Sequence, residues 1–520
     1  MRFAALGRAV KIIAVEMTKA TLLDLVDGLE GEFLVGDGGV EVSDIVYDSR
    51  KGAPGDVFVA LPSVQHDGHD FISDAYSRGV RTFVVERWAE DAPKDVTVFQ
   101  VPDSRVALAG MSAIYFGFPA KKLTVIGLTG TKGKTTTSYI IKAICEAAGV
   151  DVGIIGSNGI TYPAPNDPQS VDGIFHTKGL NTTPESYELE HIFADMVAAG
   201  VTTVIMEATS QGFMMHRTDG VQFNIGVFTN ISHDHISPLE HPSFEHYFAC
   251  KKRIFDQSDI VVVNRDAELY GQIVDGVTTP LKTYGLSDGV DYHGEIEVGD
   301  EADHTQRFTC RAPGFADEFE TRLVGRFNVS NALCAIAVAD LLGLPVAAMK
   351  VGLATAKAMG RLEVLDVPAP YTVLIDFAHN RLSMEAMIEG VQAYHPNHLL
   401  AVFGLEGDRS HERRFDCGEM LGRYMDYTIL SDASPRMDNP DQILADIATG
   451  IERGGGAGKH ETIRDRHISI PKILDMAQPG DVVLLVGKGA VTYEEVMGVN
   501  HPFDERDVVA DYFADKTAGA

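Results

Sequence analysis

A glycine-rich loop with two lysines is the sharpest chemical signal in the sequence. It follows the apolar run LTVIGLT, precedes the helical run SYIIKAICEAAG, and consists of Gly130, Thr131, Lys132, Gly133, Lys134, Thr135 and Thr136. The glycines let the backbone curl around phosphate oxygens, while Lys134 can reach the β- and γ-phosphates and Thr135 can bind Mg²⁺. Leu128 stands where the common loop has a further glycine, so this is a variant. We expect the loop to bind a nucleoside triphosphate rather than to be an ordinary turn.

Further candidate groups follow two later strands. Glu207 ends the run TTVIME, and His235 comes shortly after the run NIGVFTN. Ligands bind at the carboxyl ends of the strands of a parallel sheet, so the two groups could hold a second Mg²⁺ there. Singly, Glu207 could cap a helix and His235 could be a surface histidine, but their joint placement favours a site. Lys251, near the start of a helix, would by itself be interpreted as a solvated charge.

The elements that must position these groups alternate between short apolar strands and amphipathic helices, which predicts parallel sheets covered on both faces. The fold class is α/β with three domains. We expect a small α/β domain at residues 1–118, a central P-loop parallel-sheet ATPase domain at 119–358, and a Rossmann-like domain without a G-x-G-x-x-G fingerprint at 359–520. An antiparallel ribbon is predicted near residues 292–324.

Composition limits the classes of partner. The 520 residues carry 44 Lys and Arg against 74 Asp and Glu, a formal charge of −30. This balance argues against a nucleic-acid or anionic-membrane surface, since both need clustered basic residues. The five cysteines never form C-x-x-C, so neither a disulfide framework nor a zinc site is expected.

The N-terminus resembles a signal peptide only superficially. Arg8, Lys11 and Glu16 interrupt its apolar stretch, and no small-residue cleavage site follows. We therefore expect a cytoplasmic protein, most simply a monomer. Translation could start at Met1 or at Met17, because MTKATLLDLVDGL reads as a natural beginning.

Many blocks, in order, resemble the Mur ligases, the ATP-dependent peptide synthetases of peptidoglycan precursor assembly. They are GTKGKTTT, NTTPES, MEATSQ, HRTDG, FTNISHDH, YFACKKRIF, GRFNVSNALCA, GRLEVL, IDFAHN and HPFDERDV. The blocks DSR and PGDVFVAL resemble the uridine-binding N-terminal domain of the enzymes that add a diamino acid to UDP-N-acetylmuramoyl-L-alanyl-D-glutamate. The block DHISPLEHPSFEHYFACKKRIF is more similar to the branch that adds L-lysine. The resemblance implies that the dipeptide's carboxylate is phosphorylated by ATP and that the resulting acyl phosphate is attacked by the incoming amine.

The resemblance also implies residue roles. The catalytic residues would be Lys134, Lys251 and His379, with Lys251 carbamylated to N6-carboxylysine. ATP would be bound by the glycine-rich loop together with Asn328, Asn331, Arg361 and Asp376. The UDP-sugar peptide and the amino acid would contact Ser49, Thr182, Thr183, Thr209, Arg217, Arg409 and Arg436. Mg²⁺ would be held by Thr135, Glu207, His235 and carbamylated Lys251.

Two specificity loops depart from the pattern of diaminopimelate-adding enzymes. The D-N-P-R motif is replaced by residues 433–436, Ala-Ser-Pro-Arg, and G-K-G-H-E by residues 487–491, Gly-Lys-Gly-Ala-Val. Arg436 would suit the distal carboxylate of diaminopimelate or could equally be a solvated loop residue, whereas the other blocks favour lysine. The distal ammonium of lysine needs a carboxylate, and the nearby candidates are Asp432, Asp438, Asp408 and Glu406. L-Lysine, L-ornithine and meso-diaminopimelate therefore stay open.

Three other classes of protein fit the sequence less well. A folylpolyglutamate-type synthetase shares the ATP-binding half but would not need the N-terminal domain, and a cyanophycin-type ligase would need a further ATP-grasp portion. A non-enzymatic nucleotide-dependent scaffold would predict a degraded metal cluster, yet Lys134, Thr135, Glu207, His235 and Lys251 are all present.

Overall fold

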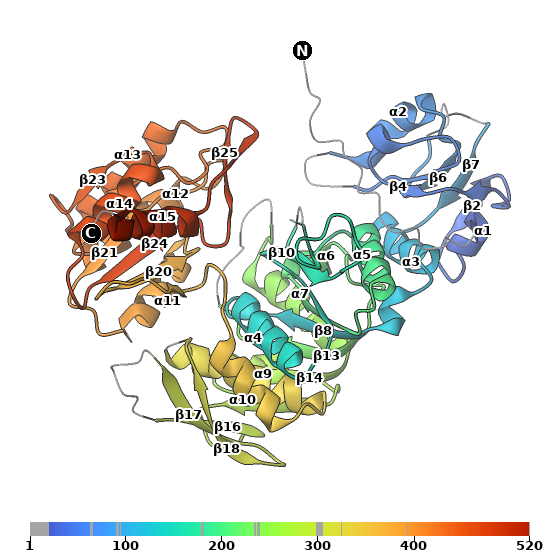
Figure 1. The fold of residues 1–520 in the computed structure, drawn as a ribbon. Coiled ribbons are helices and arrows are strands. Elements are labelled where there is room, and N and C mark those ends of the chain that lie inside the picture. The colour runs from blue at the N-terminus through green and yellow to red at the C-terminus, as the bar shows by residue number, and fades with distance from the viewer. Residues whose placement is uncertain are drawn as a thin grey trace. The chain divides into compact units, whose positions relative to one another are not determined.

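The computed structural model describes residues 20–518 apart from 63–65, 90–92, 94, 178–180, 233–235, 237–239, 298–304, 324 and 393. The chain divides into two compact units, Met1–Tyr292 with Cys334–Met349 and His293–Leu333 with Lys350–Ala520 (Figure 1). The alternative start at Met17 and the candidate ligand His235 lie outside the described residues.

The first unit begins with a small α/β layer, as the sequence predicted. Its five-stranded sheet has the order β2 (Glu32–Val35), β7 (Thr97–Gln100), β6 (Thr82–Val85), β5 (Val57–Val59), β4 (Ile45–Val46). All neighbours are parallel except β2 and β7. The remaining elements are β1 (Ala20–Thr21), β3 (Glu41–Val42), α1 (Leu22–Leu25), α2 (Ile72–Ser77) and α3 (Ser104–Tyr115). The half-buried Trp88 packs against Phe83 of β6, with 5.5 Å between ring centroids.

A larger sheet follows in the same unit. Its strands in this unit have the order β11 (Ile174–Thr177), β10 (Gly159–Pro163), β9 (Val152–Gly156), β12 (Thr203–Glu207), β8 (Thr124–Thr129), β13 (Phe223–Phe228), β14 (Ser258–Asn264), β15 (Leu281–Gly285). From β9 to β15 every neighbouring pair is parallel, and β10 and β11 add an antiparallel edge. The carboxyl ends of β8, β12 and β13 therefore meet at one edge, where the sequence placed its candidate groups.

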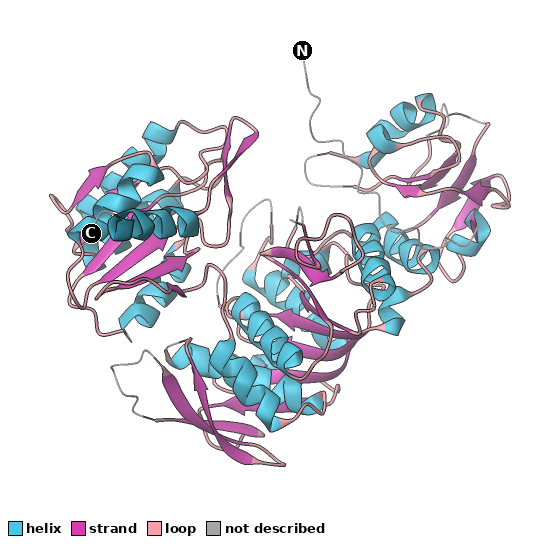
Figure 2. Cartoon of the chain, viewed as in Figure 1, coloured by secondary structure: helices cyan, strands magenta, loops and turns pink. Residues whose placement is uncertain are grey.

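Helices bury this parallel sheet, which explains its continuous apolar strands (Figure 2). Helix α4 (Lys134–Ala147) packs against β8, β9 and β12, and α7 (Phe244–Asp256) packs against β8, β13 and β14. One buried cluster joins Val125, Val204 and Val261 to residues of α7 and of α5 (Ser186–Ala198). The short helices are α6 (Ser210–Met214) and α8 (Tyr270–Val274).

The second unit contains the predicted antiparallel ribbon, formed by β16 (Tyr292–Ile296), β17 (Gln306–Arg311) and β18 (Ala316–Thr321). Helices α9 (Arg326–Leu341) and α10 (Val346–Thr355) contain residues of both units.

The rest of the second unit is Rossmann-like, as expected. Its sheet has the order β19 (Glu363–Leu365), β20 (Thr372–Asp376), β24 (Val482–Val486), β21 (Leu399–Phe403), β22 (Tyr427–Leu430), β23 (His460–Thr462). Only β19 is antiparallel to its neighbour. The helices are α11 (Arg381–Gln392), α12 (Glu412–Tyr424), α13 (Pro440–Arg453), α14 (Arg466–Met476) and α15 (Glu505–Ala518), and β25 (Tyr493–Val496) pairs with β26 (Val499–Pro502).

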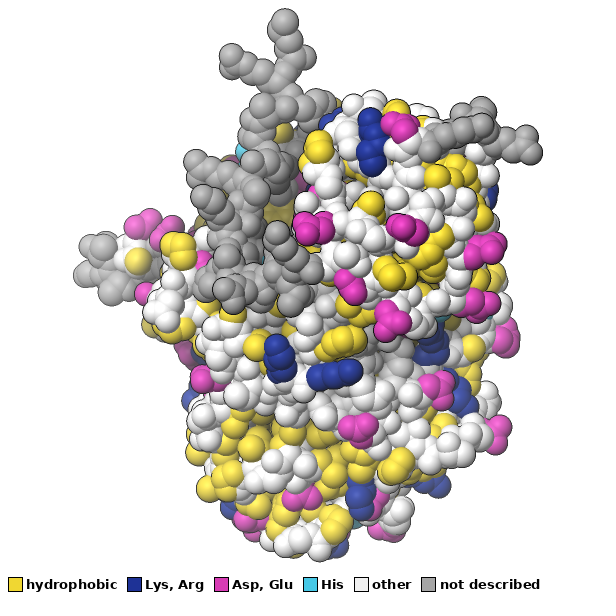
Figure 3. All heavy atoms as spheres, turned by 90° about the vertical axis from the view of Figure 1, so that its right-hand side faces the viewer, with side chains coloured by type: hydrophobic (Ala, Val, Ile, Leu, Met, Phe, Trp, Pro, Cys, Tyr) yellow, Lys and Arg dark blue, Asp and Glu magenta, His cyan; other side chains and the backbone are white. Residues whose placement is uncertain are grey.

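Among the described residues, the structure contains no helix with the length and apolar character needed to span a bilayer. On the face drawn in Figure 3, Lys and Arg side chains lie scattered among Asp and Glu side chains.

Candidate functional site

The glycine-rich loop joins β8 to α4 in the geometry expected of a phosphate loop. Gly130 and Gly133 have φ values of 142° and 86°, a region that only glycine adopts readily. A Cβ atom on Gly130 would lie 1.9 Å from Thr229 Oγ1, so the position has no room for a side chain. Lys134 Nζ folds back over the loop and donates to the carbonyl oxygens of Gly130, at 2.8 Å, and Thr131, at 3.3 Å. This places its positive charge at the N-terminus of α4, where an anion is favoured.

The end of β13 holds the loop in this shape. The Lys132 amide donates to Asn230 Oδ1 at 2.9 Å, and Asn230 Nδ2 donates back to the Lys132 carbonyl at 3.1 Å. Thr229 Oγ1 donates to the same carbonyl at 2.7 Å. Sequence reasoning did not assign Thr229 or Asn230, although their position directly after a strand of the sheet was a usable signal.

Glu207, at the end of β12, lies against the start of α4. The hydroxyl of Thr135 donates to Glu207 Oε1 at 2.8 Å, and Ser157 contacts the carboxylate with its amide at 3.1 Å and its hydroxyl at 3.2 Å. Thr182 contacts the Ser157 hydroxyl at 3.3 Å. Carboxylate and hydroxyl oxygens are the hard ligands that suit Mg²⁺, so the Thr135–Glu207 pair fits the expected ion. The predicted partner His235 lies outside the described residues.

Lys251 belongs to the same site. Its side chain is buried, and its Nζ donates to the Gly130 carbonyl at 2.8 Å and lies 4.8 Å from the centroid of the Tyr247 ring. The Tyr247 hydroxyl in turn contacts Thr131 Oγ1 at 3.0 Å. A solvated charge is therefore the wrong interpretation of Lys251, because α7 directs it at the phosphate loop.

The predicted substrate-binding residues of the first unit gather beside Glu207. Thr183 Oγ1 donates to the Glu207 carbonyl at 2.8 Å and contacts Thr209 Oγ1 at 3.0 Å. Arg217 donates to the Thr183 carbonyl at 3.2 Å and pairs with Glu185 at 2.6 Å. The sequence blocks that contain these residues are thus brought to one edge of the sheet.

Ser49 lies elsewhere in the first unit. It is buried at the start of the 3₁₀ turn Ser49–Lys51, and its hydroxyl bonds the carboxylate of Asp74, which helps to lower the pKa of that group. The structure thus places Ser49 among the elements of the N-terminal sheet.

Asn328 and Asn331 lie one turn apart on α9 and are both buried. Asn331 Nδ2 donates to Asn328 Oδ1 at 3.2 Å. The spacing of the two amides therefore puts them on one face of the helix, as a shared role requires.

Asp376 and His379 follow β20 in the second unit. The Asp376 carboxylate accepts the amides of Leu362 at 2.8 Å and Ala378 at 2.7 Å, although burial raises its pKa. The guanidinium of Arg361 lies 4.9 Å from the centroid of the Phe377 ring. Burial lowers the pKa of His379 to about 4, assisted by the neighbouring positive charges of Arg361 and Arg413. His379 is therefore neutral at pH 7.

Arg436 follows β22, at the strand edge where Glu406 follows β21. The two side chains form an ion pair of 2.9 Å, and Arg436 Nε also lies 3.4 Å from a carboxylate oxygen of Glu495 on β25. The backbone of Arg436 is fixed as well, because its amide donates to the Glu495 carbonyl at 2.9 Å. Arg436 is thus neither solvated nor a free cation.

Basic groups surround this edge. Arg409 is exposed. Burial of Arg413 lowers the pKa of that group to about 10, and the positive charge of Arg409 adds to this effect. Lys488, after β24, is buried and donates to the carbonyls of Ala433 at 3.2 Å and Tyr493 at 2.7 Å. Burial lowers the pKa of Lys488 to about 8. The sequence suggested no role for Arg413 or Glu495.

Comparisons with known proteins match most of the chain to one family. Residues 41–115 match the catalytic domain of the Mur ligase family, 128–339 the Mur ligase middle domain, and 360–489 the Mur ligase glutamate ligase domain. The UDP-N-acetylmuramoyl-L-alanyl-D-glutamate--2,6-diaminopimelate ligase of Clostridium perfringens (strain 13 / Type A) is 35% identical over 95% of this chain and 100% of its own. The UDP-N-acetylmuramyl-tripeptide synthetase of Roseiflexus sp. (strain RS-1) is 34% identical over 86% of this chain and 90% of its own.

Solved structures share the fold. A UDP-N-acetylmuramoyl-L-alanyl-D-glutamate--2,6-diaminopimelate ligase superposes with a TM-score of 0.65 at 24% identity, covering 96% of this chain and 99% of its own. A Mycobacterium tuberculosis folylpolyglutamate synthase complexed with ADP and AMPPCP gives a TM-score of 0.59 at 19% identity. This match covers 80% of the present chain and 95% of the synthase chain. The mixed α/β fold class expected from the sequence is confirmed.

Proposed function

The chain belongs to the Mur ligase family, and from this premise we propose that it joins L-lysine to UDP-N-acetylmuramoyl-L-alanyl-D-glutamate in the cytoplasm. At the coarser level it is an ATP-dependent amide-bond ligase that adds a diamino acid to this UDP-sugar dipeptide. The identity of the diamino acid is the part that we propose. It rests on the charges around Arg436.

In this proposal residues 1–118 bind the UDP-sugar, 119–358 bind ATP, and 359–520 bind the amino acid. Lys134 and the N-terminus of α4 hold the transferred phosphate, Ser49 contacts the UDP-sugar, and His379 accompanies Arg361 and Asp376 at the nucleotide. Mg²⁺ would be held by Thr135, Glu207, His235 and Lys251 carrying a carbamate, and it would supply positive charge beside the transferred phosphate. Asn328 and Asn331 lie at the adenine, and Thr182, Thr183, Thr209 and Arg217 hold the peptide.

The ion pairs of Arg436 support lysine. Two carboxylates, Glu406 and Glu495, face one guanidinium, so these three side chains together carry a charge of −1. A distal carboxylate would have to displace one of these acids and would add a further negative charge. A distal ammonium would instead be attracted to Glu406, while Arg409 remains exposed for the α-carboxylate.

meso-Diaminopimelate is the second candidate. It is favoured by the names of several relatives, which are 2,6-diaminopimelate ligases, and by the presence of Arg436 itself. L-Ornithine carries the same charges as lysine on a shorter chain and is the third candidate.

The test is phosphate release from ATP and Mg²⁺ with the UDP-sugar dipeptide and each of the three amino acids in turn. We expect lysine to give a kcat/KM at least about 100-fold above that of meso-diaminopimelate, because an unpaired buried charge costs several kcal/mol. Preferred turnover with meso-diaminopimelate would refute lysine while leaving the ligase function intact.

Variants distinguish a distal ammonium bound by Glu406 from a distal carboxylate bound by Arg436. Glu406→Gln should raise the KM for lysine by about 10-fold or more and weaken discrimination against meso-diaminopimelate, because it removes one of the two acids that pair with Arg436. Glu461→Gln, which removes a surface carboxylate paired with Lys472, is the matched control and should change neither. Equal KM values for lysine in the wild type and in Glu406→Gln would contradict the role of Glu406.

A further inference from the structure

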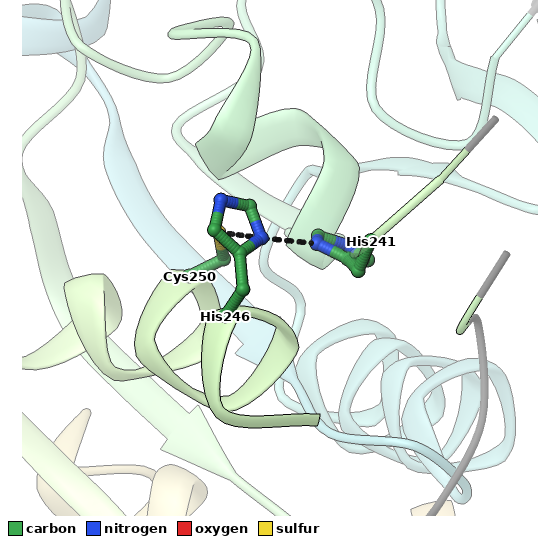
Figure 4. Close-up of side chains that lie close together, drawn as sticks. All are labelled: His241, His246 and Cys250. Atoms are coloured by element: carbon green, nitrogen blue, oxygen red, sulfur yellow. Dashed lines mark hydrogen bonds between the residues drawn. The ribbon is translucent and has the colours of Figure 1, made fainter. Parts of the chain in front are cut away.

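Two histidines and a cysteine converge beside α7, apart from the groups used above. His246 and Cys250 lie four residues apart on this helix and therefore on one face. His241 precedes the helix, and its ring lies beside the His246 ring (Figure 4). The two Nδ1 atoms are 3.0 Å apart, and His246 Nδ1 lies 3.8 Å from Cys250 Sγ. One atom from each side chain lies within 4.8 Å of the others.

The Cys250 side chain makes a different contact from that of its neighbour Lys251. Lys251, the next residue, extends to the Gly130 carbonyl, whereas Cys250 turns toward His246. The chemistry proposed for the ligase uses neither histidine nor the thiol. The cluster therefore needs an explanation of its own.

The second ring nitrogen of His241 is held in the manner of a metal ligand. His241 Nε2 lies 2.9 Å from Ser210 Oγ, the first residue of α6. When Nε2–H donates to this hydroxyl, the Nδ1 lone pair is directed at His246 and Cys250. Such an outer contact commonly fixes the tautomer and orientation of a ligating histidine. His241 and Cys250 are also buried, so water competes poorly for the site.

We propose that His241 Nδ1, His246 Nδ1 and Cys250 Sγ form a binding site for Zn²⁺. Zinc bonds of about 2.0–2.1 Å to nitrogen and 2.3 Å to sulfur, at tetrahedral angles, require edges of roughly 3.3 Å between nitrogens and 3.6 Å between nitrogen and sulfur. Two of the three edges, at 3.0 and 3.8 Å, differ from these values by only a few tenths of an ångström, and all three ligand atoms lie within 4.8 Å of one another. A ligand set of two imidazoles and one thiolate suits zinc. It does not suit Mg²⁺, which prefers oxygen ligands.

The fourth position of the tetrahedron is left for water. As the sulfur–zinc bond forms, the Cys250 thiol releases its proton to solvent, and no electron is transferred. The bound ion would fasten the chain at His241 to the first turns of α7, from which Lys251 also projects. The ion would thus stabilise the start of this helix, and its binding does not depend on which amino acid the ligase uses.

The test uses the full chain without nucleotide and in excess Mg²⁺, titrated with Zn²⁺ against a chromophoric chelator. We expect one equivalent to bind. Loss of an outer contact to a zinc ligand typically lowers affinity 10–100-fold, so Cys250→Ser and His246→Gln, which remove ligands, should lower it at least about 100-fold. Cys145→Ser, a change at another buried cysteine of the same unit, is the control and should retain the affinity.

Co²⁺ provides a second measurement. The Co²⁺-loaded wild type should show thiolate-to-cobalt charge-transfer absorption, and Cys250→Ser should lack it while keeping the metal-free circular dichroism spectrum. If the wild type binds no Zn²⁺, the three side chains are a hydrogen-bonded chain only and the proposal fails. If Cys250→Ser binds as tightly as the wild type, or if Glu207→Gln abolishes binding instead, the ion occupies another site and the proposal fails too.

Discussion

The hydroxyl of Thr135 donates to Glu207 Oε1 at 2.8 Å, although the two residues are 72 positions apart in the chain. Thr135 lies in the first turn of α4, and Glu207 ends β12, the strand next to β8 in the sheet. The parallel register of β8 and β12 therefore assembles the candidate Mg²⁺ site.

Glu207→Gln should lower kcat by about 100-fold or more, because it removes the anionic oxygen that would hold Mg²⁺ against the phosphates. The change is nearly isosteric, so the melting temperature should stay close to that of the wild type. Phosphate release and thermal melts measure the two effects. Glu146→Gln, which removes a surface partner of Lys142 on α4, is the control and should leave kcat unchanged. Normal turnover in Glu207→Gln would exclude this residue as a metal ligand.

Lys251→Ala should lose activity and regain part of it when a short-chain carboxylate is added. The added carboxylate would replace the carbamate that we assign to the buried Lys251 side chain. Steady-state rates with and without acetate measure this rescue. Lys252→Ala tests the adjacent lysine, which is bonded to the carbonyls of Gln272 and Asp275, and it should be active without acetate. Full activity of Lys251→Ala in the absence of acetate would refute the carbamate.

Arg409→Ala should raise the KM for the amino acid by about 10-fold or more and change the KM for ATP little. A charge-assisted hydrogen bond to a carboxylate contributes about 1.5–3 kcal/mol, which corresponds to this range. Arg423→Ala removes an exposed arginine paired with Glu419 on α12 and serves as the control. An unchanged KM for the amino acid would show that Arg409 does not bind its α-carboxylate.

Glu190→Gln should stabilise the protein, and more so at alkaline pH. Glu190 is buried on α5, its carboxylate oxygens have no hydrogen-bond partner among the described residues, and burial raises its pKa to about 8. Above pH 4.5 the unfolded chain loses this proton while the folded chain keeps it, so wild-type stability falls until about pH 8. The loss approaches roughly 1.4 kcal/mol per pH unit, or about 3 kcal/mol between pH 5 and pH 8.

Melting temperatures of the wild type and Glu190→Gln at pH 5 and pH 8 measure this difference. The gap between the two proteins should widen toward pH 8, whereas Glu268→Gln, at an exposed position, should follow the wild type at both values. A gap that is the same at pH 5 and pH 8 would show that Glu190 does not hold its proton in the folded state.

The sequence predicted the features that depend on local patterns. Alternating strands and helices indicated parallel sheets, and the rule that strand ends share an edge brought Glu207 to the loop that contains Thr135. The antiparallel ribbon near residue 300 also followed from alternation within short strands. These signals lie within single segments, so they can be read without knowing the tertiary structure.

Contacts between distant segments could not be predicted in the same way. The hairpin of β25 and β26 brings Glu495 to Arg436, and no local pattern in either segment predicts this ion pair. Likewise, no C-x-x-C spacing marks Cys250, because its two partners are histidines. The sequence also carried no sign that Lys251 is buried, because it stands next to other charged residues. Helix α7 turns its side chain inward.

Trp88, beside Phe83 in the N-terminal sheet, is the single tryptophan of the 520 residues. Fluorescence excited beyond the absorption of tyrosine therefore originates from this one indole. An emission shift during urea unfolding reports the packing around β6, while circular dichroism reports the helices of the whole chain. The protein thus carries its own optical label for the N-terminal sheet, and no dye has to be attached.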